Sequence, residues 1–100
     1  MRFTLIVPDG TMAIDGVGHQ INVSSAPSGL HAVQWYGAWG EEEWSDERGQ
    51  IILNQEISSY DDYQWAINAW DNANAEFQAT IAARQKITQS IVGESGPTVI

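Results

Sequence analysis

The sequence predicts a mainly β domain with one long C-terminal helix, in which the strands form a small, strongly bent antiparallel barrel. Two observations predict this class. The first half of the chain consists of short β-branched and aromatic segments separated by turn residues, and the second half changes to helical spacing. The length of 100 residues corresponds to one domain, and 43% apolar residues is ordinary for a globular protein.

Six short strands are expected, at about residues 2–7, 11–14, 17–23, 31–36, 41–45 and 50–54. Turn residues separate them: Pro8-Asp9-Gly10-Thr11 closes the first strand, and Asp15-Gly16 is a favoured hairpin dipeptide. Short strands at such close spacing are typical of small barrels. The last strand contains Ile51, Ile52 and Leu53 in succession, so we expect it to be covered on both faces.

The helix is expected at about residues 59–91. Ser59 is a favourable N-cap, and Asp61 and Asp62 follow in the first turn, where the helix dipole favours anions. Gly93 is a typical residue for ending a helix. The sequence therefore predicts a single domain over residues 1–92 and a flexible tail over residues 93–100.

One face of this helix carries an apolar stripe with a single polar member. We call it the helix stripe, and its members are Tyr63, Ile67, Trp70, Asn74, Phe77 and Ile81. The stripe is long for packing on a barrel of this size, so we expect either this stripe or the strand edges to join subunits. The sequence leaves open whether the stripe packs within its own chain or between subunits. Asn74 has two interpretations: it specifies register between helices, as in coiled coils, or it caps a polar pocket on the protein's own barrel or lies at the edge of the contact.

The five tryptophans divide by position. Trp35, Trp44 and Trp70 occupy core-facing positions by period, whereas Trp39 lies in a turn where period is uninformative. Trp65 falls on the helix face opposite the stripe. Because aromatic residues are enriched at interface cores, we expect Trp65 to contact a neighbouring subunit.

The net charge of −9 disfavours nucleic-acid binding, because such affinity comes mainly from Lys and Arg on phosphates. RNA or DNA binding is kept as an alternative. In a ring of identical subunits, a few basic residues and histidines of each subunit would recur around the central pore. The groups that would serve are Arg2, His19, His31 and Arg48.

No motif predicts catalysis. The chain contains no P-loop, Rossmann turn, zincin or nucleophile elbow, and no cysteine for a disulfide or thiolate metal site. His19 and His31 with nearby acids form the basis of a remote alternative, a metal-dependent hydrolase, but their spacing does not ensure that ligands converge. Glu41 and Glu43 are expected to face outward by strand alternation. No catalytic residue, metal or cofactor is expected.

Several segments resemble a family of small, uncharacterised proteins from marine phages of the cyanophage type. They are Val7-Pro8-Asp9-Gly10-Thr11, Ile14-Asp15-Gly16, His31-Ala32-Val33-Gln34-Trp35 and the closing helix rich in Tyr and Trp. The resemblance implies an Sm/LSm-like fold, a short bent barrel that assembles into rings, together with RNA or DNA binding. The Sm consensus segments, including their Arg-Gly pair, have no match here, and the helix follows the strands instead of preceding them. No RNA-contact residue is therefore carried over.

The expected function is that of a non-enzymatic phage protein that forms a homo-oligomeric ring and acts as an assembly or interaction module. Its expected place is the cytoplasm of an infected host cell or the virion. The apolar run from Phe3 to Val7 is too short for a signal peptide or a membrane span, so neither secretion nor membrane insertion is expected.

Overall fold

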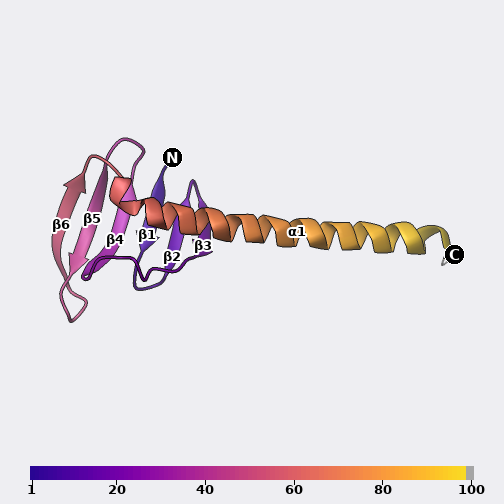
Figure 1. The fold of residues 1–100 in the computed structure, drawn as a ribbon, viewed down its shortest axis with the longest axis horizontal. Coiled ribbons are helices and arrows are strands. Elements are labelled where there is room, and N and C mark those ends of the chain that lie inside the picture. The colour runs from indigo at the N-terminus through magenta and orange to yellow at the C-terminus, as the bar shows by residue number, and fades with distance from the viewer. Residues whose placement is uncertain (99–100) are drawn as a thin grey trace.

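The computed structural model describes residues 1–98 as one antiparallel six-stranded sheet with a long helix across it (Figure 1). The order of strands across the sheet is β3-β2-β1-β4-β5-β6, and every neighbouring pair is antiparallel. The strands are β1 (Phe3–Ile6), β2 (Thr11–Ile14), β3 (Val17–Gln20), β4 (Leu30–Trp35), β5 (Gly40–Ser45) and β6 (Ile51–Ile57). The mainly β class and the C-terminal helix are confirmed, and β2 has the predicted bounds.

The sheet is open, so the predicted closed barrel is not found. Closure would require β3 and β6 to pair with each other, whereas each is an edge strand with one partner. Strong bending of a sheet needs bulges or glycine kinks repeated around it. Among the strands of residues 1–98, the register shifts at Leu30/Ala32 and at Trp44/Ser45, both in the β4–β6 half. The β1–β3 half keeps a regular register.

The core lies between one face of the sheet and the start of the helix. Strand alternation directs Phe3, Leu5, Met12, Val33 and Trp35 to this face, which we call the helix side. Helical residues cover them from above: Tyr63, Ala66, Ile67 and Trp70 are buried. The core-facing positions predicted for Trp35 and Trp70 are confirmed, and Trp44 packs against the same core while remaining partly accessible.

The helical segment begins with a 3₁₀ turn, η1 (Asp61–Tyr63), and continues as α1 (Gln64–Thr98). The N-cap of this turn is Tyr60, which makes no side-chain capping hydrogen bond, so the predicted N-cap at Ser59 is wrong by one residue. The Ser59 hydroxyl nevertheless accepts a hydrogen bond of 3.1 Å from the Asp61 N–H. The predicted end at Gly93 is wrong, because α1 continues to Thr98. A glycine inside a helix costs about 1 kcal/mol relative to alanine and does not forbid the helix.

The molecule is elongated because α1 is much longer than the sheet is wide. The principal dimensions are 67 × 30 × 17 Å and the radius of gyration is 19.4 Å, against about 13 Å for a compact chain of this length. Figure 1 shows α1 crossing the sheet toward β3 and continuing far beyond that edge. Within the described part of the chain, no helix is long and apolar enough to cross a membrane.

Candidate assembly surfaces

The first half of α1 is anchored on the edge strand β3. Trp70 donates a hydrogen bond of 2.8 Å from Nε1 to the carbonyl oxygen of Val17. The His19 ring lies between Trp70 and Phe77, with ring centroids 5.4 and 5.5 Å away, and its Nε2 lies 2.9 Å from Asn74 Oδ1. These contacts favour the second interpretation of Asn74, because its amide meets a polar group of its own chain.

Beyond this anchor, α1 leaves the sheet. The α1 backbone comes close to the sheet mainly at β2 and β3, and Phe77 at the β3 edge is already 50% exposed. Ile81 is partly accessible, and Ile87 is exposed. We call the part of α1 that follows Phe77 the overhang. The helix stripe is therefore divided: Tyr63, Ile67 and Trp70 pack within the chain, whereas the rest of the stripe lies at or beyond the β3 edge.

The opposite edge of the sheet is the second uncovered surface. β6 exposes three consecutive apolar side chains, with Ile52 at 66% and Leu53 at 51% exposure, so its expected coverage on both faces is wrong for the single chain. β6 contains no proline and no lysine, the residues that commonly protect edges from pairing. Leu53 lies opposite Trp44 in the register, which places it on the helix side, and Asn54 lies opposite Glu43 on the other face.

A buried carboxylate fixes the start of the helix to β5. Glu42 is only 7% exposed, and its two oxygens accept hydrogen bonds from the Tyr63 hydroxyl and from Trp44 Nε1. Glu41 and Glu43 face outward as predicted. The same alternation places Glu42 inward, and this was the signal in the sequence that could have identified it. Unpaired buried charges are costly, so both donors contribute to holding Glu42.

Burial raises the pKa of the Tyr63 phenol far above its usual value of about 10, and the hydrogen bond to Glu42 and the negative charge of Glu42 and Asp62 raise it further. The folded state therefore keeps the phenol protonated, whereas the unfolded chain ionises it near pH 10. This stabilisation is fully present below about pH 10 and declines as the pH rises above that value. We expect the urea midpoint of the wild-type chain to fall between about pH 9 and pH 11.

Tyr63→Phe is the variant that isolates this effect. Below pH 9 it should lower the free energy of unfolding by about 1–3 kcal/mol, because the buried Glu42 loses a donor. Above pH 10 its midpoint should fall less steeply than that of the wild type, since no phenol remains at this position. Parallel slopes for the two proteins in this alkaline range would show that Tyr63 does not carry the pH dependence.

Trp65 packs partly against its own core. It lines a hollow of about 310 Å³ together with Ser25, Pro27, Trp44 and Tyr63, among others. The β3–β4 loop and β5 thus lie around the Trp65 ring, which the helical period of the sequence had placed on the outer side of the helix. Its predicted contact with a neighbouring subunit stays a prediction.

The groups considered for nucleic-acid binding are not gathered into one patch. Arg2 lies beside the β2–β3 and β4–β5 turns, where its N–H donates to Asp15 and its Nε donates to the Tyr36 carbonyl. Arg48 lies in the β5–β6 turn, at the opposite end of the strands. His19 is engaged under α1, and His31 is on β4. In a single chain these four positions form no continuous basic surface.

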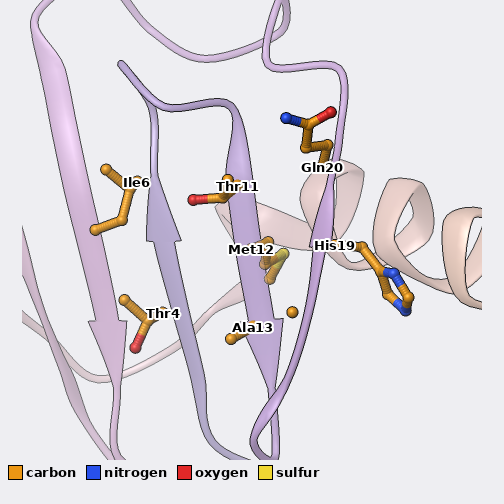
Figure 2. A pocket seen from close by; sticks show the side chains of 8 residues that line it. Thr4, Ile6, Thr11, Met12, Ala13, His19 and Gln20 are labelled. Carbon is orange, nitrogen blue, oxygen red and sulfur yellow. The ribbon is translucent and has the colours of Figure 1, made fainter.

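The face of the sheet opposite α1 has a shallow apolar hollow. It has a volume of about 380 Å³, and Figure 2 shows Thr4, Ile6, Thr11 and Ala13 along it, with α1 behind the strands. Its lining includes no carboxylate, and the imidazole of His19 is engaged by Asn74. Among the described residues, no three His, Asp or Glu side chains are grouped as a metal site would require. The hollow therefore provides no group of converging acids and bases for catalysis.

Comparison of the chain with protein-family models, curated proteins and solved structures finds no match.

Proposed function

We propose that the chain is a non-enzymatic homo-oligomeric module, in which the overhang and the sheet edges join copies of the same chain into a larger assembly. The observation that carries the proposal is the extension of α1 beyond its own sheet. Isolated helices gain little stability in water, and helices in proteins are stabilised mainly by packing an apolar face. In the single chain, the overhang has no sheet beneath it.

The expected ring and phage context belong to this proposal. A ring forms when copies associate head to tail and their rotation closes, and an open filament forms when it does not. The six-stranded sheet supports head-to-tail association because it presents two different free edges, β3 and β6. The Sm-like resemblance is retained only for this mode of assembly, since the sheet in the single chain is open.

Ile81→Asp tests the overhang as an assembly surface. A carboxylate at the partly accessible Ile81 should dissociate the oligomer, because burying an unpaired charge in an apolar contact is unfavourable. Light scattering coupled to size-exclusion chromatography measures the mass. Ala79→Asp is the matched control. Ala79 is exposed and lies on nearly the opposite side of the helix from Ile81, about 160° away, so this variant should keep the wild-type mass. Equal masses for both variants and the wild type would count against the overhang as a surface that joins copies of the chain.

A further inference from the structure

The two uncovered surfaces are complementary to each other. The strands alternate in direction, so the edge strands β3 and β6 run in opposite directions. A second copy placed beside β3 in the same orientation therefore presents its β6 antiparallel to β3. Both copies then have their helix sides on the same face. The two edges pair as an ordinary antiparallel ladder, and the unpaired N–H and C=O groups of both edges are satisfied.

The overhang leaves the first copy over this same edge and on this same face. Neighbouring strands lie about 4.8 Å apart, and a helix crossing them rises 1.5 Å per residue, so one strand corresponds to about three residues of helix. Phe77 contacts His19 on β3. The next strand in the extended sheet, β6 of the second copy, thus falls beneath the part of α1 around Ile81.

β6 is the strand that needs such a cover. Its Leu53 faces the helix side but is 51% exposed, because α1 begins near β5 and extends away from β6. Residues 78–87 contain Arg84 and Lys86 and no acid, and the β5–β6 turn contains Asp46 and Glu47. The acids Glu41, Glu43 and Glu56 lie on the face of the sheet away from the overhang.

We infer that β3 of one copy pairs with β6 of a second copy of this chain, and that the overhang covers Leu53 of that second copy through Ile81. The inference rests on the proposed self-association and specifies its geometry. The contact between two copies has two parts: the strands pair across the junction, and the helix of one copy lies over it. The surface that each copy contributes is different. Each copy keeps one free edge, so the association continues to further copies.

Disulfide cross-linking tests this geometry on a clean background, because the chain contains no cysteine. Ile81→Cys and Leu53→Cys are purified separately, the second with ¹⁵N label, and then mixed and oxidised with glutathione. A disulfide requires Cα atoms within about 7 Å. We expect a covalent dimer of one labelled and one unlabelled chain. Replacing Leu53→Cys by Asn54→Cys, on the opposite face of the same strand, should reduce the yield by about tenfold, since its side chain points away from the overhang.

Two other results would overturn the inference. Cross-linking of Ile81→Cys with itself would place two overhangs side by side as a helix pair, and efficient cross-linking of Ile52→Cys with itself would place two β6 edges around a twofold axis. The mass of each cysteine variant is measured in reducing buffer. Oligomers without a mixed 81–53 disulfide would refute this geometry and leave the proposed function standing, whereas a monomeric wild-type chain would refute both.

Discussion

Trp70→Ala should lower the free energy of unfolding by about 3–5 kcal/mol, the usual cost of removing a buried large aromatic ring. Trp70 is 9% exposed, packs against the His19 ring and donates to the Val17 carbonyl. Its loss removes the main attachment of α1 to β3 and leaves a cavity. Total stabilities of 5–15 kcal/mol are typical, so the variant should be close to unfolding.

Urea denaturation followed by circular dichroism, at equal protein concentrations, measures this effect. Trp39→Ala is the matched control, because Trp39 is 42% exposed in the β4–β5 turn, where its ring packs against Tyr36 in a tilted arrangement. We expect it to cost about 0.5–1.5 kcal/mol, the value of an aromatic pair. Similar losses for the two variants would mean that Trp70 is not the principal anchor of the helix.

Gly40→Ala should be the most damaging small substitution. A Cβ at Gly40 would lie 2.5 Å from the Gln34 carbonyl oxygen and 2.8 Å from Cε3 of the buried Trp35. Gly40 pairs with Trp35 on one side and with Ile57 on the other, so neither strand can move away freely. Overpacking of this kind costs about 1–3 kcal/mol, and more when backbone must shift.

Gly18→Ala provides the comparison, because a Cβ there meets only the Ala13 methyl at 3.9 Å. That distance is ordinary van der Waals contact, and alanine loses less backbone entropy than glycine on folding. The urea midpoint of Gly18→Ala should equal or exceed that of the wild type, whereas Gly40→Ala should lower it clearly. A tolerated Gly40→Ala would show that β4 and β5 pack more loosely than the structure indicates.

Local features of this fold are readable in the sequence. The Asp15-Gly16 turn, the bounds of β2 and the outward positions of Glu41 and Glu43 all follow from turn chemistry and strand alternation. Glu42 was accessible to the same reasoning, but its importance depends on Tyr63, which lies 21 residues further along the chain. The tertiary structure brings the Tyr63 hydroxyl to the inward-facing Glu42, and local sequence patterns do not show this.

The spacing of apolar residues along the sequence could not predict barrel closure or the surface against which the helix stripe packs. Closure depends on whether the edges β3 and β6 meet, and no local pattern specifies this. An apolar stripe has the same spacing whether it packs on its own sheet or on a neighbour's. Asn74 illustrates the point: its partner His19 is 55 residues away, and only the fold brings the two together.

Sedimentation equilibrium of the wild-type chain at micromolar concentration measures whether copies of the chain associate. We expect a mass that is a multiple of the 11.0 kDa chain and that falls when Ile81→Asp is introduced. A single species of 11.0 kDa across the whole concentration range would contradict it.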